Sequence, residues 1–581
     1  MVETTATNEK QQTGYPSIDK PWLKYYSENS INAPLPEKTM YEYIWEKNKD
    51  YPEDNAFHYY GTRISYGKLF EMIQKSISFF YDIGIRKGDI VTIMSMHTPE
   101  VLYALYGLNY IGAVANMVYL TLSDREILHT LRDTESKALM VLDVAIERVA
   151  RIHDQIEIPV FILGVADSMP MVKKAAYFVK EQAGRMKTHR KTIIPTYLSF
   201  SKMVLSVDDS CLKDVTMSHD HEAAAVIVYT SGTTGEPKGV VLSSDCLNAV
   251  AYQLSATDRD YKRGDKALLA IPSFLGYGIS MLHLCVSEGM LGDLFITLNN
   301  AAVGIEFDKF RPNRLVTGPP CLDDIMKYSK GNLHHVIEVT GGGSLINAEK
   351  EREFNSFLHK HGSRTQYLSG YGMTECASVL FLNMRHAYKK DSLGVPLPSV
   401  SVKIEDTDTH EELQFDCLGE ICVSSPSLMI GYFRNNEATK EAVETDERGM
   451  RWLHTGDLGY VDKDGFVFIT GRIKRVFYTR GSDGVIYRIF CQRIEDICMS
   501  HQNAKLCGVV VREDEERLNI PIVYTVLKEP ERKQATILEI KQIAGAELPE
   551  HMRPAEICVV DYIPLTASGK VDYRRLTEKY E

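Results

Sequence analysis

Residues 223–240 read AAAVIVYTSGTTGEPKGV, an apolar run that passes directly into a loop of hydroxyl and glycine residues. The run Ala223–Tyr229 is short and bounded by turn-forming residues, which predicts a buried strand. Glycines in the loop permit positive φ and close approach of the backbone to a ligand. Consecutive N–H groups in such a loop form a concavity that binds anions. We therefore expect a triphosphate to bind at Thr230, Ser231, Gly232, Thr233, Thr234, Gly235 and Lys238.

This loop differs from the common P-loop, GxxxxGK[ST], because Pro237 stands where that motif has its second glycine. The alternative interpretation is a flexible surface loop rich in glycine and threonine. We disfavour it because the loop, with its lysine, directly follows a strand predicted to be buried.

Further apolar runs alternate with helix-like stretches through most of the chain. They are Asp89–Met94, Ala138–Leu142, Ile158–Leu163 and Lys266–Pro272. This alternation predicts parallel sheets covered on both faces, hence an α/β fold. From about Asp391 the strands follow one another closely, and Asp464-Gly465 marks a hairpin turn between two apolar runs. The stretch after Arg472 is typical of a small α+β unit.

Length and composition restrict the class of protein. The chain has 581 residues, more than one hydrophobic core usually serves, so at least two domains are expected. Its net charge of −12 disfavours nucleic acid as a partner, because phosphate binding needs a basic surface. Eleven cysteines without a CxxC pair indicate neither a disulfide framework nor a zinc cage, and Cys491 and Cys498 are interpreted as packed thiols.

Two stretches bear on localisation. The N-terminus, MVETTATNEKQQTGYPS, lacks the apolar core of a signal peptide. The longest apolar stretch, Tyr103–Leu120, is interrupted by glycine and asparagine, so we expect a buried helix and strand rather than a membrane span. A cytoplasmic enzyme is the simplest expectation.

The segment 170–191 carries a local excess of basic residues. Its charged residues are Lys173, Lys174, Lys180, Glu181, Arg185, Lys187, Arg190 and Lys191. One interpretation is a weak peripheral membrane contact through a basic helix. The other, which we favour, is a solvated surface insertion.

Five more motifs follow the phosphate loop in order. They are TGGGSL (Thr340–Leu345), GYGMTE (Gly370–Glu375), WLHTGD (Trp452–Asp457), GRIK (Gly471–Lys474) and PLTASGK (Pro564–Lys570). Together they resemble the adenylate-forming superfamily, and within it the acyl-CoA synthetase branch. The resemblance covers roughly residues 40–580, and an ordered set of motifs is far more specific than any one alone.

The resemblance implies a domain organisation. An N-terminal extension, 1–35, precedes an adenylation domain, 36–473, built from two α/β subdomains and a small β-barrel-like subdomain. A small mobile α+β domain, 474–581, follows a hinge near Lys474. The family first joins an acid to AMP with release of pyrophosphate, and the small domain then rotates so that CoA attacks the adenylate.

The resemblance also assigns roles to residues. Gly341, Gly342, Gly343, Tyr371 and Gly372 would hold adenine, and Asp457 and Arg472 the ribose and phosphates. Glu375 and Thr230 are the expected Mg²⁺ ligands, since Mg²⁺ prefers oxygen. Thr374, Glu375, Lys238 and Lys570 are the expected catalytic residues, with Lys570 stabilising the charge that develops between carboxylate and α-phosphate. The expected ligands are thus ATP, Mg²⁺ and coenzyme A.

Three positions depart from the family pattern. Ser244 stands where many members have histidine. Leu275 stands where many members have histidine or an aromatic residue, so the gating role of that side chain in the family does not carry over to Leu275. Cys491 replaces a proline after the hinge strand. The stretch GSDGVIYR at 481–488, on the surface expected to meet CoA, is also unusual for the family.

The acyl pocket is expected at Gly276–Ser280, Thr317–Pro320, Thr340–Ser344 and Leu368–Leu380, whose small residues we interpret as room for a long or wide acyl group. Leu275 and Gly276 follow Phe274 where amino-acid-activating members carry aspartate, so a free amino acid is disfavoured. A medium- or long-chain fatty acid or an aromatic acid fits. A ligase that loads a carrier protein, a luciferase-type oxidation and a catalytically silent binding protein stay as alternatives, and the chain is expected to be a monomer or a homodimer.

Overall fold

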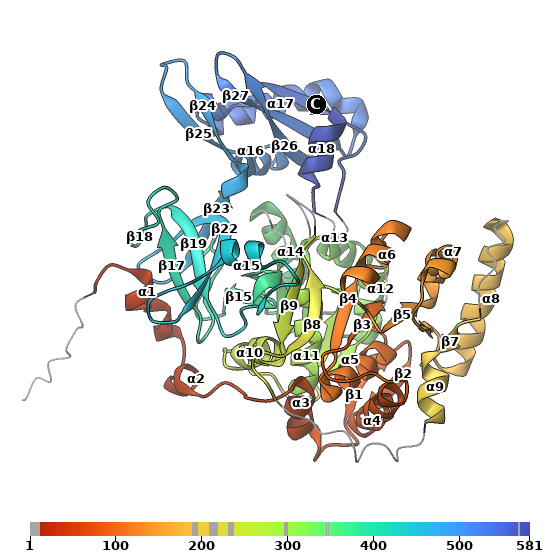
Figure 1. Ribbon diagram of the computed structural model, residues 1–581. Coiled ribbons are helices and arrows are strands. Elements are labelled where there is room, and N and C mark those ends of the chain that lie inside the picture. The colour runs from red at the N-terminus through yellow and green to blue at the C-terminus, as the bar shows by residue number, and fades with distance from the viewer. Residues whose placement is uncertain are drawn as a thin grey trace, which may run out of the picture.

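The computed structural model describes residues 12–188, 196–207, 219–230, 237–295, 300–343, 346, 348–566 and 570–580. Two large sheets, a smaller antiparallel sheet and a separate C-terminal group of elements make up the molecule (Figure 1). The Ser231–Gly235 part of the predicted phosphate loop lies outside the described residues.

An eight-stranded sheet carries the start of the phosphate loop. In sheet order its strands are β20 (Gly431–Tyr432), β9 (Gly239–Ser243), β8 (Ala224–Tyr229), β4 (Val114–Val118), β3 (Ile90–Met94), β5 (Ala138–Leu142), β6 (Val160–Leu163) and β7 (Leu198–Ser199). β8 pairs with β4 in parallel and with β9 antiparallel, and its middle is buried. The predicted buried strand is therefore confirmed, as are the runs that form β3, β5 and β6.

A nine-stranded sheet carries the predicted adenine and acyl segments. In sheet order its strands are β16 (Val395–Pro396), β15 (Val379–Leu382), β14 (Tyr367–Gly372), β13 (Glu338–Gly341), β12 (Arg314–Thr317), β10 (Lys266–Leu269), β11 (Leu291–Asp293), β1 (Asn55–Tyr59) and β2 (Thr62–Ser65). The strands from β14 to β1 run parallel, and antiparallel strands close both edges. Because the carboxyl ends of parallel strands meet at one edge, the turns after β13 and β14 lie together.

Helices fill the space between the two sheets. α5 (Pro99–Ile111) packs on β4 and on α4 (Tyr66–Asp82), while α10 (Ser244–Ser255) packs on β9 and on α11 (Gly276–Ser287), which covers β10 and β11. The stretch 103–120 thus forms α5 and β4 and is almost entirely buried, as predicted. The other helices of this part are α1 (Pro16–Asp19), α2 (Glu28–Asn32), α3 (Met40–Asn48), α6 (Asp124–Asp133), α7 (Ile146–Arg151), α8 (Met171–Thr188), α9 (Phe200–Ser206), α12 (Asn300–Phe310), α13 (Pro319–Tyr328), α14 (Ala348–Lys360) and α15 (Asn436–Ala442).

A six-stranded antiparallel sheet forms the predicted small β subdomain. Its strands are β18 (Glu412–Leu413), β17 (Ser401–Glu405), β19 (Gly419–Ser424), β22 (Arg451–Val461), β21 (Val443–Thr445) and β23 (Val467–Arg472). β22 and β23 form the hairpin expected at Asp464-Gly465.

The C-terminal elements stand above the small β subdomain (Figure 1). They are β24 (Val476–Arg480), β25 (Ile486–Phe490), α16 (Cys491–Met499), β26 (Ala504–Asp514), β27 (Leu518–Leu527), α17 (Lys533–Glu547), β28 (Glu556–Val559) and α18 (Tyr573–Tyr580). They enclose two hydrophobic clusters of their own. The cysteines that the structure describes are free thiols, and Cys491 and Cys498 are buried there as predicted.

The basic segment forms most of α8, which lies at the periphery of the molecule (Figure 1). Its start exposes apolar side chains: Met171, Val172, Phe178 and Val179. Lys173 donates a hydrogen bond to the carbonyl of Tyr60, while residues 189–191 lie outside the described part. Either interpretation of this segment stays a prediction. Within the described residues, none of the helices combines the length and the apolar character that a membrane span requires.

Candidate functional site

Two hydrogen bonds between Thr230 and Lys238 join the two ends of the phosphate loop. The N–H of Thr230 donates to the carbonyl of Lys238 over 3.0 Å, and the N–H of Lys238 donates to the Thr230 hydroxyl over 3.0 Å. These bonds extend the β8–β9 hairpin to the mouth of the loop. The hydroxyl oxygen of Thr230 keeps a second lone pair, which fits its expected role as a ligand for Mg²⁺.

Glu375 and Lys238 both contact one tyrosine, Tyr432. The hydroxyl of Tyr432 donates to Oε1 of Glu375 over 2.8 Å, and Nζ of Lys238 lies 4.6 Å from the centre of the Tyr432 ring. Burial, and then the carboxylate of Glu375, raise the pKa of Tyr432, so its hydroxyl keeps its proton and donates. Tyr432 is a site residue that sequence reasoning missed. It lies in the two-residue strand β20, too short for a periodicity to reveal.

Thr374 and Glu375 occupy a short 3₁₀ turn, Thr374–Cys376, at the end of β14. The turn ends at Ala377, whose φ of 59° is unusual for a residue with a side chain. The carbonyl of Ala377 accepts a hydrogen bond from Ser280 over 3.1 Å. Helix α11 thus fixes the turn that presents the predicted catalytic threonine and the predicted metal ligand.

Tyr371, Asp457 and Arg472 form a connected group between β14 and the β22–β23 hairpin. The Tyr371 hydroxyl donates to Oδ2 of Asp457 over 2.5 Å. Nε of Arg472, directly opposite Asp457 on β23, lies 3.0 Å from Oδ1. Asp457 is only 1% exposed, and Oδ1 accepts no hydrogen bond of good geometry. A buried carboxylate oxygen without such a partner fits a site for a ribose hydroxyl.

Burial raises the pKa of Asp457, and the positive charges of Arg472 and Lys570, with the Tyr371 hydroxyl, act in the opposite direction. The predicted adenine face of Tyr371 is covered on one side, because Phe381 stacks on it with ring centres 5.2 Å apart. Its role toward adenine stays a prediction.

Lys570 comes from the C-terminal elements and stands just before α18. Its backbone closes a turn with Thr566, whose N–H donates to the Lys570 carbonyl over 2.7 Å. Burial and the charge of Arg472 lower the pKa of Lys570, while the charges of Asp457 and Glu375 act in the opposite direction. The catalytic role of Lys570 stays a prediction.

The glycines of the predicted acyl and adenine segments serve packing. A Cβ at Gly276 would lie 2.7 Å from the carbonyl oxygen of Ala377, and one at Gly278 2.0 Å from that of Pro272. A Cβ at Gly341 would lie 2.0 Å from the Tyr367 hydroxyl. The interpretation of these glycines as room for the acyl group is therefore wrong, since protein atoms already fill that space. Gly372 is filled likewise. By contrast, Gly343 has open space around it and a φ of +85°.

Two departures from the family pattern have structural explanations. Ser244 is buried at the start of α10, where its hydroxyl accepts a hydrogen bond from Asn109 over 3.0 Å. Cys491 begins α16 within the C-terminal hydrophobic core. Leu275 is half-buried just before α11, and nothing in the structure explains its choice.

Comparisons with known proteins agree with this geometry. The family model described as AMP-binding enzyme matches residues 44–433, and the model described as AMP-binding enzyme C-terminal domain matches residues 493–570. The chain is 25% identical to a long-chain-fatty-acid–CoA ligase of Bacillus subtilis, over 96% of this chain and 98% of that protein. It is 24% identical to 4-coumarate–CoA ligase 3 of Arabidopsis thaliana, over 89% of this chain and 87% of that protein.

Solved structures share the fold. ATP-bound MatB from Rhodopseudomonas palustris superposes with a TM-score of 0.77 at 21% identity, covering 93% of this chain and 99% of that one. A benzoate CoA ligase from Burkholderia xenovorans gives a TM-score of 0.74 at 18% identity, covering 93% and 99%. With the phosphate loop and the buried aspartate, the family matches lead to one conclusion: this chain belongs to the family of AMP-binding enzymes.

Proposed function

We propose that the protein is an ATP-dependent acid–CoA ligase. It would activate a carboxylic acid as an acyl-AMP with release of pyrophosphate and then transfer the acyl group to CoA. The observation that carries this proposal is the contact of Tyr371 and Arg472 with Asp457, which brings three of the family motifs together around one buried carboxylate. Lys570, to which the family resemblance assigns the first step, would stabilise the charge that develops at the α-phosphate beside this group.

Each side chain has a task that its surroundings support. Asp457, held by Tyr371 and Arg472, would accept hydrogen bonds from the ribose through Oδ1, which accepts no hydrogen bond of good geometry from the protein. Lys238 and the loop N–H groups neutralise phosphate charge, and Thr374 offers a hydroxyl at the end of β14. Glu375 and Thr230 would hold Mg²⁺, which supplies charge neutralisation at the phosphates when bound.

The hinge that the two steps require has a structural basis. Arg472 is tied to Asp457 in the small β subdomain. Arg475 forms two hydrogen bonds with Glu495 of α16, at 3.0 and 2.9 Å, and so belongs to the C-terminal elements. Only Ile473 and Lys474 lie between these anchors, and Lys474 is exposed. We therefore place the hinge there, with 36–473 as the adenylation domain and 474–581 as the mobile domain.

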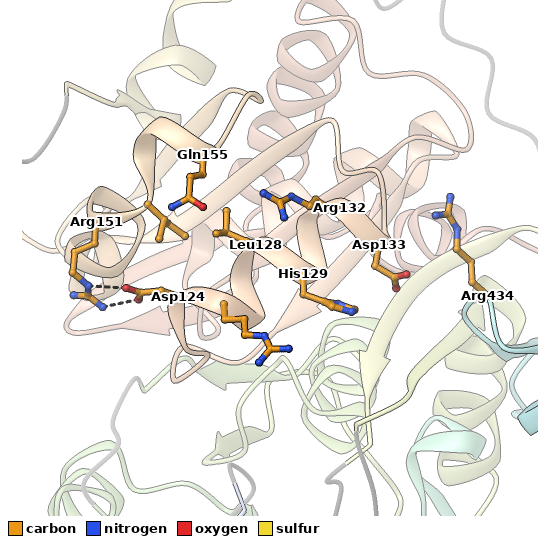
Figure 2. Close-up of a pocket in the computed structure, with 10 residues that line it drawn as sticks. Asp124, Leu128, His129, Arg132, Asp133, Arg151, Gln155 and Arg434 are labelled. Atoms are coloured by element: carbon orange, nitrogen blue, oxygen red, sulfur yellow. Dashed lines mark hydrogen bonds and ion pairs between the residues drawn. The ribbon is translucent and has the colours of Figure 1, made fainter.

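A basic cavity supports CoA as the acyl acceptor. The cavity holds about 940 Å³, and Figure 2 shows its lining along α6 and α7 with Arg434 at one side. The basic side chains that line it are Arg125, His129, Arg132, Arg151 and Arg434. Asp124 and Asp133 also line the cavity. Arg151 pairs with Asp124 and Arg434 with Glu135, so Arg125 and Arg132 are the basic side chains that would meet phosphate groups.

CoA carries phosphates at both ends of its nucleotide, whereas a carrier protein presents one. The multiple arginines thus favour free CoA over a carrier protein.

A buried arginine bears on the acid substrate. Arg259 is 5% exposed and donates to the hydroxyl of Thr340, in a predicted acyl segment, over 2.5 Å. It also pairs with Glu338, yet its Nε and Nη2 have no hydrogen-bond partner. A buried donor without a partner costs roughly 1–3 kcal/mol, which a substrate acceptor would recover. Among fatty and aromatic acids, this favours one whose far end carries a carbonyl, hydroxyl or carboxylate.

The test is pyrophosphate release with a panel of acids, with and without CoA. Acids of equal length with and without a terminal oxygen should differ about tenfold in kcat/KM, and acyl-CoA should form only with CoA. Arg132→Ala should raise the KM for CoA about tenfold and leave the KM for ATP unchanged. Pyrophosphate release without acyl-CoA formation would indicate a carrier-protein ligase, light emission would indicate an oxidation, and no release with any acid would indicate a silent binding protein.

A further inference from the structure

One face of the six-stranded sheet gathers metal-binding side chains from three strands. Glu405 lies on β17, Glu420 and Cys422 on β19, and His454 on β22. Glu405 is the cross-strand partner of Glu420, and Cys422 is the cross-strand partner of His454. Cross-strand partners and residues two apart on a strand share a face, so all four side chains point the same way. Glu405 and Cys422 are buried, whereas His454 is half-exposed and gives the cluster access to solvent.

The side chains converge on Nδ1 of His454. Sγ of Cys422 lies 3.4 Å away, Oε2 of Glu420 3.2 Å and Oε2 of Glu405 3.8 Å. Ligand atoms about 2.0–2.3 Å from a tetrahedral zinc ion are themselves about 3.4–3.6 Å apart. The separations in the cluster are thus close to the edges of a zinc coordination tetrahedron.

Glu405 supplies a second and independent indication. It is 4% exposed, and its Oε2, the atom aimed at His454, accepts no hydrogen bond. Lys403 pairs with the other oxygen, Oε1. The His454 imidazole lies 3.8 Å from this oxygen, beyond hydrogen-bond distance. A metal ion held by both residues would give the buried oxygen a direct partner.

We propose that Glu405, Cys422 and His454 bind a divalent transition-metal ion, zinc in the first place, with water or Glu420 in the fourth position. A thiolate, an imidazole and a carboxylate are a ligand set suited to zinc and unlike the all-oxygen sets of Mg²⁺. Nε2 of His454 then carries the proton and faces Oε2 of Glu444 at 3.5 Å. That carboxylate orients the ring as outer carboxylates do at zinc–histidine sites.

Metal binding at this cluster displaces protons. Burial, and then the carboxylates of Glu405 and Glu420, raise the pKa of the Cys422 thiol. The hydrogen bond with Glu420 raises the pKa of His454. The metal must therefore displace the thiol proton and, at lower pH, an imidazolium proton, so its affinity rises with pH.

The site lies next to the nucleotide residues without being part of them. Between His454 and Leu458 the pairing of β22 with β19 shifts, so that Asp457 sits in a bulge. The N–H of Gly456 in that bulge donates to Oε1 of Glu420 over 2.9 Å. The metal is thus expected to stabilise the strand that presents Asp457. This inference does not depend on the proposed reaction.

The test uses the full chain, freed of metal with a chelator and titrated with Co²⁺. Coordination through Cys422 gives the near-ultraviolet charge-transfer band of a cobalt–thiolate bond, with one Co²⁺ per chain, and Zn²⁺ abolishes it. Cys422→Ser should lose the band, whereas Cys417→Ser, which removes an exposed thiol outside the cluster, should keep it. Binding at either of the two other histidine clusters among the described residues produces no such band because neither has a thiol; they are His219, His221 and Asp245, and His58, Asp293 and Glu306.

Glu405→Gln provides a second measurement that keeps the thiol. It should retain the band and weaken Co²⁺ binding at least tenfold. A wild-type chain without the band, a band that survives Cys422→Ser, or an unchanged affinity in Glu405→Gln would each overturn the proposal. If Cys422→Ser fails to fold, the affinity of Glu405→Gln decides.

Discussion

The hydroxyl of Tyr371 donates a 2.5 Å hydrogen bond to Oδ2 of Asp457, and this bond joins the nine-stranded sheet to the small β subdomain. The two residues come from motifs far apart in the sequence. Oδ1, the other oxygen of Asp457, is buried and lies 3.0 Å from Nε of Arg472, so both carboxylate oxygens are held by residues of the predicted nucleotide site.

Asp457→Ala should raise the KM for ATP about a hundredfold, since a hydrogen bond to a charged group contributes about 1.5–3 kcal/mol. The KM for the acid should stay within about twofold. Tyr371→Phe is the matched control: it keeps the ring and its stacking on Phe381 and removes only the hydroxyl, so its effect on ATP should be smaller. A rise in the acid KM alone would place Asp457 in the acyl pocket instead.

Glu375→Gln should lower the rate of ATP–pyrophosphate exchange about 10²–10³-fold, because the site loses a charge that the expected Mg²⁺ needs. The amide keeps the volume and still accepts the hydrogen bond from Tyr432. Tyr432→Phe, which removes that bond and keeps the carboxylate, should have a weaker effect. Exchange near the wild-type rate in Glu375→Gln would contradict the metal assignment.

Lys570→Ala should nearly abolish acyl-AMP formation, whereas chemically prepared acyl-AMP should still be converted to acyl-CoA. The lowered pKa of Lys570 adds a pH dependence. Adenylation needs the charged ammonium. Its rate should therefore fall at a pH below 10.5, the pKa of an ordinary lysine. Lys579→Ala, at an exposed lysine of α18, should leave both steps intact. Equal loss of both steps in Lys570→Ala, with unchanged Tm, would show that Lys570 serves more than the first.

Lys474→Pro should separate the half-reactions, because proline fixes φ in the two-residue link between Arg472 and Arg475. We expect adenylation to persist and CoA transfer to fall at least tenfold. Lys474→Ala removes the same side chain without restricting the backbone and should retain both. If proline and alanine behave alike, the hinge lies elsewhere.

Glu100→Gln should alter the pH dependence of stability. Burial raises the pKa of Glu100 to about 7 in the folded chain, from 4.5. The folded state therefore holds a proton that the unfolded state has lost, and stability falls as pH rises from about 4.5 through 7. The variant has no carboxyl group at this position and does not lose this stability. The difference in free energy of unfolding, variant minus wild type, should therefore be larger at pH 8 than at pH 5, by up to about 3 kcal/mol. Denaturant unfolding at both pH values measures the difference, and the exposed Glu53→Gln should show none.

The sequence predicted the parts of the fold that depend on local patterns. β3, β5, β6 and β8 are continuous apolar runs, and the turn at Asp464-Gly465 specifies its hairpin. The motif resemblance assigns Tyr371 and Asp457 to one site, and the structure brings these two residues into contact, while the place of Lys570 in that site stays a prediction. Those predictions worked because each rests on neighbours in the chain or on a family resemblance.

Contacts between distant segments could not be predicted. Tyr432 joins Lys238 to Glu375 only because β20 pairs with β9, and no local pattern marks it. Glu405, Cys422 and His454 come together through strand register, whereas the spacing of the cysteines had argued against a zinc site. The glycines at 276, 278 and 341 were misread for the same reason, since only the folded chain shows what lies beside them.

The close packing around these glycines limits how the substrate range can be redesigned. Adding a methyl group at Gly276, Gly278 or Gly341 would push the backbone or side chain opposite and loosen α11 or β13, so loss of activity there would reflect misfolding rather than a narrowed pocket. A side chain would have space at Gly343, but the backbone φ there is one that residues other than glycine rarely adopt. Mutant libraries aimed at new acids should therefore leave all four positions fixed and vary side chains such as Leu275 and Tyr277 instead.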